Sequence, residues 1–582
     1  MQTMFGYISK NDENEISNTY FKRIASVSKI KTFRFFHNKH LGYGIENNPR
    51  VTFTETFSFS AVKMILAGDF IRKDELVRKI RSYKKEYVGP ENVYDALKAE
   101  ISQLIKTIDG VFCIVLFDTG SNSVTVFSDQ HGIMPIYYFY DSRLFLFGTS
   151  IKCTIACPGF LKQVNSDSIF ELFKLGFTIP PSTLFKGISM LMPGEMLDYN
   201  GELKISRINE PEIYDPVEEE LEHLVHEYYA CLRSSITDIL TGFKNCTLLL
   251  SGGIDSAAIA AILSKISNIK LDCLTIDLNP VGDFESKGAQ RISALFGLSH
   301  RIIDKTAGDL VQQLTEAIWH YEAPVYNGIT EYILTRNIGK EADIVLTGDG
   351  NDLIWGITGI CSDRHLKERR VCFDDYYLKF RSCINDYLLD VALLRKPDKS
   401  MLSEKLNRAF IDTGNFYNDF LYADQKLFGS SCACNVVGKL RVGPSEALFR
   451  FPYLSKKIEN LVNSLPVEYK IGNNDSEPVC KYLFKTALSH AAILPYDIIH
   501  TQKRWMPSPA GEWLRYGLKD CFEKLVFKSD SSLKNYFRMT LIKDMWTLHQ
   551  LPKNDYSYFL MMVLTFEIWH KMFIESCDIQ AY

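Results

Sequence analysis

The pattern of apolar and polar residues divides the chain into two parts. Up to about residue 205, short runs rich in β-branched and aromatic residues alternate with turn residues, a pattern typical of strands joined by tight connections. The clearest runs are residues 110–118 (GVFCIVLFD), 124–132 (VTVFSDQHG) and 136–150 (IYYFYDSRLFLFGTS). This part is therefore expected to form a sheet-rich layered domain.

A polar segment with two prolines, residues 209–216, follows and predicts a domain boundary near residue 212. The domains would then span residues 1–212 and 213–582. After the boundary, apolar residues recur at helical spacing, at Leu221, Leu224, Val225, Tyr228, Leu232 and Ile236.

Strand and helix signals then alternate. Apolar strands are expected at residues 247–250, 271–276 and 344–347, with helices between them. This order predicts an α/β fold in which helices cover both faces of a parallel sheet. Beyond about residue 365 we expect long helices without strands, packed on the sheet as an extension. The apolar run at residues 558–566 is predicted to be a buried helix.

Composition and charge exclude several classes of protein. With 582 residues, 46% of them hydrophobic, the chain can bury the cores of more than one domain. Its formal net charge of -4 provides no basic field, so nucleic acid is not an expected partner. The first residues turn charged too early for a signal peptide, and no apolar run reaches the ~18 residues of a membrane helix. Fourteen cysteines without CxxC spacing favour reduced thiols and a cytoplasmic location.

The most informative string is Ser251-Gly252-Gly253-Ile254-Asp255-Ser256, between an apolar strand and an alanine-rich helix. Two glycines at the carboxyl end of a parallel strand let backbone amides approach an anion, and the helix N-terminus adds positive potential. The two serines would donate hydroxyls to phosphate. A carboxylate there would repel phosphate unless a cation intervened, so Asp255 is predicted to bind Mg²⁺. Taken alone, the string also fits an ordinary turn with Asp255 as a helix cap.

This string resembles the pyrophosphate loop of the N-type ATP pyrophosphatases, which cleave ATP between the α and β phosphates and adenylate a carbonyl oxygen. The segment 344–356 (IVLTGDGNDLIWG) resembles the second signature of the asparagine synthetase family. That resemblance implies ATP and Mg²⁺ as cofactors, with Gly348 at the nucleotide and Asp352 as the second Mg²⁺ ligand. It places Asp349 beside the acyl-adenylate, where we expect it to act as the base for the incoming amine.

Residues 481–515 resemble the C-terminal signature of the same family, and Lys503 falls on its lysine. A cation there would stabilise negative charge in the transition state, and the neighbouring Arg504 is an alternative. A second carboxylate, Asp374 or Asp375, is a weaker candidate to assist Asp349, since both also fit an exposed helix face. Two further candidates for contact with the nucleotide are Glu285 and Lys287.

The first part of the chain resembles the glutamine amidotransferase domain of the family, through FGYI, IDGVFCIVLFD, SDQHGIMPIYY and LFKGISMLMPGE. Such a domain uses a cysteine thiol to attack glutamine, but Phe5 occupies that position and the first cysteine is Cys113. Where the family has an asparagine-glycine pair for the oxyanion, this chain has Ala67-Gly68. Glutaminase activity is therefore predicted to be lost.

A synthetase that cannot release ammonia from glutamine needs another amine. The resemblance implies two precedents for ring closure, the lasso-peptide macrolactam synthetases and the β-lactam synthetases, and we favour the lasso type. The expected substrate is a peptide or a small amino acid; lasso-type systems also imply a leader-peptide recognition protein and a maturation protease. Ammonia-dependent asparagine synthesis, amidation of another carboxylate and a nucleotide-binding module without activity are the alternatives. Ser455, where asparagine synthetases usually have aspartate, also departs from the parent enzyme.

Overall fold

The computed structural model describes most of the chain, and the account below concerns the residues that it describes. These are residues 3–9, 19–24, 33–37, 40–46, 53–86, 93–208, 219–266, 268–278, 284–305, 309–326, 328–356, 360, 372–433, 447–474, 477–501 and 508–575. The predicted domain boundary near residue 212 lies outside them and stays a prediction.

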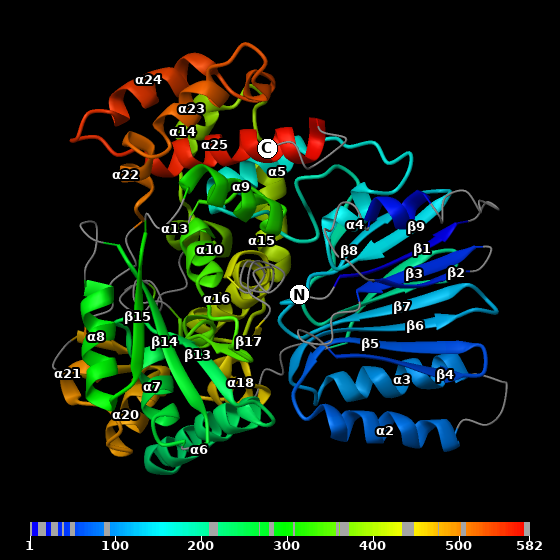
Figure 1. Cartoon of the computed structure of the whole chain (residues 1–582), viewed down its shortest axis with the longest axis vertical. Coiled ribbons are helices and arrows are strands. Elements are labelled where there is room, and N and C mark those ends of the chain that lie inside the picture. Colours follow the sequence, from blue (N-terminus) through cyan, green and yellow to red (C-terminus); the bar gives the residue numbers. More distant parts are fainter. Residues whose placement is uncertain are drawn as a thin grey trace.

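Two six-stranded antiparallel sheets form the N-terminal part (Figure 1). The first has the order β10-β8-β9-β1-β3-β2 and the second the order β12-β11-β7-β6-β5-β4. The strands are β1 (Met4–Ser9), β2 (Phe33–His37), β3 (Leu41–Glu46), β4 (Phe53–Phe59), β5 (Val62–Phe70), β6 (Gly110–Asp118), β7 (Ser123–Ser128), β8 (Tyr137–Tyr140), β9 (Leu144–Gly148), β10 (Ser189–Met190), β11 (Glu195–Tyr199) and β12 (Leu203–Arg207). The layered domain expected from the sequence is confirmed.

Strand β6 shows why its sequence is apolar throughout. Its residues alternate between two cores, because successive side chains of a strand point to opposite faces. Val115 and Phe117 pack between the two sheets, whereas Ile114 and Leu116 pack under the helices α2 (Lys73–Glu86) and α3 (Val93–Ile105). Both faces of the second sheet are therefore buried, and a continuous hydrophobic run results.

The C-terminal part is built on a five-stranded parallel sheet with the order β15-β14-β13-β16-β17. Its strands are β13 (Asn245–Leu249), β14 (Lys270–Asp277), β15 (Ser299–Asp304), β16 (Ile344–Leu346) and β17 (Leu448–Arg450). Helices cover it, as predicted: α6 (Leu221–Leu240), α7 (Ile254–Leu263), α8 (Phe284–Phe296), α18 (Lys456–Asn463), α20 (Tyr482–His490) and α21 (Tyr496–Ile499) share one core, and α9 (Leu310–Tyr321) and α10 (Gly328–Arg336) belong to another. The chain runs from β13 to β14 and β15 on one side and then returns to β16 and β17 on the other. Ligands of open α/β sheets bind at such a reversal of strand order, outside the carboxyl ends of the strands.

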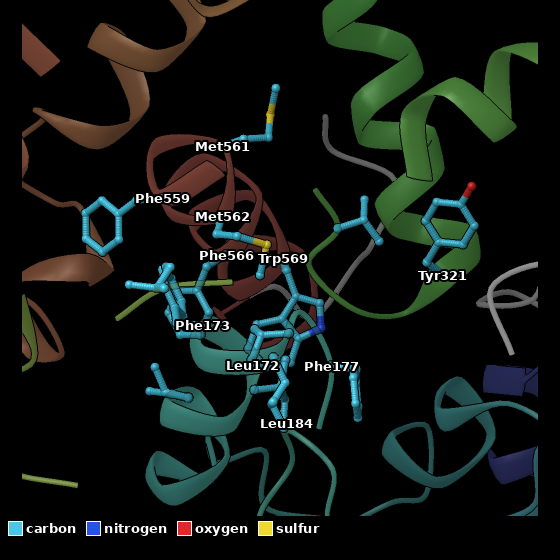
Figure 2. Close-up of a cluster of buried hydrophobic side chains, with 14 of the residues drawn as sticks. Leu172, Phe173, Phe177, Leu184, Tyr321, Phe559, Met561, Met562, Phe566 and Trp569 are labelled. Atoms are coloured by element: carbon cyan, nitrogen blue, oxygen red, sulfur yellow. The ribbon is translucent and has the colours of Figure 1, made fainter. Parts of the chain in front are cut away.

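A helical region joins the two parts of the molecule. It contains α13 (Phe373–Arg381), α14 (Asp386–Ala392), α15 (Lys399–Ala409), α16 (Phe416–Asp424), α22 (Ala510–Arg515), α23 (Lys519–Val526), α24 (Met539–His549) and α25 (Ser557–His570). Helix α25 is apolar on all sides because it is enclosed by neighbours, as predicted for residues 558–566. Figure 2 shows its side chains Phe566 and Trp569 beside Phe173 of α5 (Ser166–Leu175), which comes from the N-terminal part. In the described part of the chain, no helix combines the length and apolarity needed to span a bilayer.

The prediction of long helices without strands beyond residue 365 was wrong. The helices are short, and β17 is the fifth strand of the parallel sheet. A hairpin of β18 (Ile471–Asn474) and β19 (Glu477–Cys480) follows α19 (Val467–Lys470). These strands have three or four residues each, too few to show a period of two.

Candidate active site

The turn at Ser251–Gly253 lies at the carboxyl end of β13, beside the point where the strand order reverses. Ser256, in the first turn of α7, stabilises this turn: its hydroxyl accepts the Ser251 N–H at 3.0 Å and lies 3.0 Å from the Ser251 hydroxyl. The N-cap of α7 is Gly253, so Asp255 lies in the first turn of the helix and does not cap it. The alternative role of Asp255 as the cap of this helix is therefore excluded.

The amide of Gly252 already binds an anionic group. It donates to the Oε2 atom of Glu285, on the first turn of α8, at 3.0 Å. Gly252 also packs against α8 so closely that a Cβ atom there would lie 3.0 Å from the Phe284 carbonyl oxygen. A side chain at residue 252 would push the turn away from α8. The predicted candidate Glu285 thus reaches the turn itself, and contact of Lys287 with a nucleotide stays a prediction.

The second turn, after β16, rests directly on the first. A Cβ atom at Gly348 would lie 3.2 Å from the Cβ atom of Asp255 and 3.2 Å from the Ser256 nitrogen. Gly350 has a φ of 94° and lies so close to Leu454 that an added Cβ atom would come within 2.5 Å of Cγ. The glycine at 348 therefore allows the second turn to meet the start of α7 at the reversal of strand order, and the glycine at 350 allows it to pack against Leu454.

This contact gives a direct prediction. Replacing Gly348 with alanine is expected to lower ATP-dependent pyrophosphate release about tenfold or more, because relief of the overpacking moves the second turn away from α7 and so misplaces the groups of the site. The matched control is Gly120→Ala, in an exposed turn where the nearest atom to an added Cβ lies 3.4 Å away. Equal activities of the two variants would contradict the role given to the contact.

Asp255 and Asp352 converge on one cation, the ammonium group of Lys481. Its Nζ atom lies 2.7 and 2.8 Å from the two carboxylate oxygens of Asp255 and 2.9 Å from Oδ1 of Asp352. Asn351 donates to Oδ1 of Asp255 at 2.5 Å. Burial by itself lowers the pKa of Lys481, but the charges of the two aspartates outweigh it and raise that pKa above its ordinary value.

The two carboxylates also fit a magnesium site. Mg²⁺ is usually held by one or two carboxylates together with the phosphates of the substrate, and the contacts to Lys481 place oxygens of both aspartates around one centre of positive charge. Lys481 was not among the residues predicted for the site. It opens the string KYLFK in the matched C-terminal segment, but nothing in that string distinguishes it from a surface lysine.

Asp349 lies at the same edge of the sheet, in the turn after β16. The Thr347 hydroxyl donates to its Oδ2 atom at 2.7 Å. Burial, and to a smaller extent the negative charge of Asp349, raises the pKa of Glu331 on α10. The alternatives Asp374 and Asp375 occupy the first turn of α13 beside Cys372, half-buried and exposed respectively. A role for Asp374 or Asp375 beside Asp349 stays a prediction.

Lys503 and Arg504 lie outside the described residues, which resume at residue 508. The choice between them stays a prediction.

The presence of Ser455 in place of aspartate has a local explanation, because its hydroxyl caps α18 by accepting the Ile458 N–H. Aspartate is an equally good cap, so this difference from the asparagine synthetases does not indicate a new substrate.

The predicted loss of the glutaminase site has a structural counterpart in both N-terminal sheets, at Phe5 on β1 of the first and at Ala67-Gly68 on β5 of the second. Phe5 is fully buried on β1 and packs against three aromatic rings with centroids 5.5 to 6.3 Å away, those of Tyr20, Phe21 and Phe35. Ala67 is also fully buried. Gly68 has a φ of 133°, and a Cβ atom there would lie 2.3 Å from the Val111 carbonyl oxygen. Apolar groups therefore occupy the positions where glutamine chemistry would need a thiol and an amide side chain.

Comparison with known proteins agrees with this arrangement of turns and sheets. The asparagine synthase family matches residues 227–411 and 447–571, and the glutamine amidotransferase domain matches residues 74–207. The chain belongs to the asparagine synthase family. Its members are ATP-dependent C–N ligases that form amides, and this chain is an enzyme of that class. The amidotransferase match begins after Ala67-Gly68, so it does not include the altered positions.

Relatives of this asparagine synthase family member are distant but cover most of it. Glutamine-hydrolyzing asparagine synthetase 1 of Bacillus subtilis (strain 168) is 20% identical over 93% of this chain and 91% of its own length. A putative glutamine-hydrolyzing asparagine synthetase of Mycobacterium bovis is 22% identical over 81% of this chain and 78% of its own length. A solved glutamine phosphoribosylpyrophosphate amidotransferase from B. subtilis, complexed with ADP and GMP, covers 52% of this chain and 65% of its own, with 10% identity and a TM-score of 0.24.

Proposed function

We propose that this enzyme adenylates a carboxylate with ATP and couples it to an amine that does not come from glutamine. One observation carries the proposal. In the synthetase site the turn after β16 packs against the start of α7, whereas Phe5 occupies the position of the glutaminase nucleophile within an aromatic cluster. Relatives named as glutamine-hydrolyzing would need a thiol at that position. The chain therefore keeps the two turns of the synthetase site but has no thiol at the position of the glutaminase nucleophile.

The proposed first step uses the edge of the sheet where β13 and β16 end. The N-terminus of α7 would bind the phosphates of ATP, and the Gly252 amide would join it by exchanging the Glu285 carboxylate for a phosphate oxygen. Asp255 and Asp352 would hold Mg²⁺, which supplies charge neutralisation to the phosphates when bound. Lys481 holds the two aspartates in place, and Lys503 would add a second cation. The substrate carboxylate attacks the α-phosphate, and pyrophosphate leaves.

In the proposed second step an amine attacks the acyl-adenylate. Asp349 lies in the turn that touches α7 and would accept a proton from the amine. The favoured amine belongs to the substrate itself, so that the product is a macrolactam of the lasso-peptide type. A peptide substrate of this kind would bring a leader-peptide recognition protein and a maturation protease as partners, in the cytoplasm. β-Lactam closure, amidation of another carboxylate and ammonia-dependent asparagine synthesis are the competing outcomes.

The test is pyrophosphate release from ATP and Mg²⁺, screened over three substrate sets. These are aspartate with ammonia, small amino diacids, and linear peptides with an internal Asp or Glu. Release that requires a linear peptide, with a product lighter by one water, would support macrolactam closure. Release with aspartate and ammonia would support asparagine synthesis instead, and no release with any set would contradict the proposal. Glutamine hydrolysis is expected to be undetectable throughout.

A further inference from the structure

The solvent-facing side of α6 carries histidines among acidic residues. Residues 219–232 contain four glutamates and two histidines but no lysine or arginine. Glu222 and His226 are both exposed and lie four positions apart, so they are neighbours on one face of the helix. A segment of this composition presents negative potential to the solvent and attracts cations.

A second histidine reaches this pair from another helix. His490 is the last residue of α20, which packs against α6 (Figure 1). The ring centroids of His226 and His490 are 4.4 Å apart. One nitrogen of each imidazole and a carboxylate oxygen of Glu222 all lie within 4.8 Å of one another. None of these three side chains forms a hydrogen bond or an ion pair with another residue that the structure describes, so their polar atoms are accessible to a ligand from solvent.

The chemistry of these three groups fits a transition-metal ion. Imidazole nitrogen is a good ligand for Zn²⁺, whereas Mg²⁺ and Ca²⁺ prefer oxygen. Zn²⁺ is often held by three protein ligands, with water in the fourth position, through bonds of about 2.0–2.2 Å. Such bonds bring the ligand atoms closer together than 4.8 Å, and exposed side chains reach that spacing by changes of rotamer.

A neighbouring group on α6 differs from this one. Glu219, His223 and Glu227 also lie close together and are exposed. However, His223 already forms an ion pair with Glu219, and the group offers one imidazole where the other offers two. The pair of histidines from two helices is therefore the stronger site for Zn²⁺.

The two helices that such an ion would join also support the synthetase site. Lys481, which holds the two aspartates of that site, is the N-cap of α20. On the inner side of α6, Tyr228 contacts Phe484 of α20 and Trp355, with ring centroids 5.8 and 5.5 Å away. Trp355 ends α11 (Asn351–Trp355), the helix that follows the second turn. An ion on the outer side of α6 and α20 would restrict movement of these helices against each other.

We propose that Glu222, His226 and His490 bind one Zn²⁺ ion that fastens α20 to α6. The site is separate from the proposed Mg²⁺ site, because His490 ends the nine-residue helix that Lys481 begins, and nine helical residues span about 13 Å. The bound ion stabilises the folded chain by mass action and takes no part in the proposed reaction.

The test is Zn²⁺ binding by the full chain, freed of metal with a chelator that is then removed. Excess Mg²⁺ is kept present so that sites made of oxygen ligands are filled. Calorimetry should show a Zn²⁺ ion that binds to the unsubstituted chain, and His226→Ala and His490→Ala should each weaken this binding at least about tenfold, because only two of the three ligands remain. Zn²⁺ at a hundredfold excess over its dissociation constant should raise the melting temperature by about 2 °C, and both variants should lose this shift.

His500→Ala is the matched control, since His500 is an exposed histidine directly after α21 and outside the group. It should keep both the affinity and the shift. Equal binding by the unsubstituted chain and His490→Ala would overturn the inference, because cysteines or other groups would then hold the ion. Loss of binding in His223→Ala alone would assign the ion to the neighbouring group and overturn it as well, as would no binding at all. Binding and melting are measured without substrate, so failure of the proposed function would leave this test unaffected.

Discussion

Replacing Asp255 with asparagine is expected to lower ATP-dependent pyrophosphate release by at least about 1,000-fold. Asp255 makes most of the contacts within the site: its carboxylate accepts hydrogen bonds from Lys481 and Asn351, and its Cβ atom lies beside Gly348. Loss of its charge removes a proposed Mg²⁺ ligand and one of the two carboxylates that hold Lys481. Such electrostatic contributions are worth several kcal/mol, and each 1.36 kcal/mol corresponds to a factor of ten in rate. Pyrophosphate release and equilibrium binding of ATP with Mg²⁺ both measure the effect.

The control for this prediction is Asp530→Asn, an equivalent change at an exposed acid. It should leave pyrophosphate release within about twofold of the unsubstituted enzyme, as surface substitutions usually do. A thermal melt of Asp255→Asn separates loss of function from loss of fold. If the folded variant kept more than a tenth of the activity, Asp255 could not be the ligand that its position suggests.

The second large effect is expected in stability. Asp69→Asn should lower the free energy of unfolding by about 3–5 kcal/mol, the usual cost of breaking a buried ion pair. Asp69, on β5 of the N-terminal part, is paired with Arg450 on β17 of the parallel sheet, and both side chains are only 7% exposed. The change leaves the Arg450 guanidinium buried without its counter-charge. Chemical denaturation measures the loss, provided that the unfolding is reversible.

The chain offers a matched control that also joins its two parts. Arg72 donates to Asp238 on α6 at 2.9 Å, but these side chains are 55% and 31% exposed. Asp238→Asn should therefore cost at most about 1 kcal/mol, as exposed pairs do. Similar losses in the two variants would show that burial of the Asp69–Arg450 pair contributes little.

These contacts suggest why the N-terminal part is retained without the glutaminase residues. Asp69 directly follows Ala67-Gly68, which occupy the positions of the family's oxyanion pair. It forms an ion pair with Arg450 on β17, the strand next to β16. Nearby, Lys456 on α18 donates to the carbonyl oxygen of Ile105 at 2.6 Å. Its backbone N–H donates to Asp109 at 2.9 Å. The N-terminal part therefore supports the sheet on which the synthetase site is built.

The sequence by itself determined the elements whose signal is local. The strand before Ser251, the glycine turn and the alanine-rich helix are contiguous, so their order alone placed a glycine turn at the carboxyl end of a parallel strand. The apolar pattern of residues 110–118 and of residues 558–566 identified a strand and a helix that are buried on all sides. Because residue 5 is phenylalanine, the sequence alone predicted the loss of the glutaminase nucleophile, a cysteine thiol.

Only the tertiary structure decided which side chains meet. Lys481 reaches Asp255 across 226 positions of the chain, and Arg450 reaches Asp69 across 381. A charged residue alone does not reveal its partner, since ion pairs are formed by distance in space and not by spacing in sequence. The same holds for β17, whose three residues become a strand because β16 lies beside them. Pairing with a neighbour gives so short a strand its hydrogen bonds, and no local pattern encodes that neighbour.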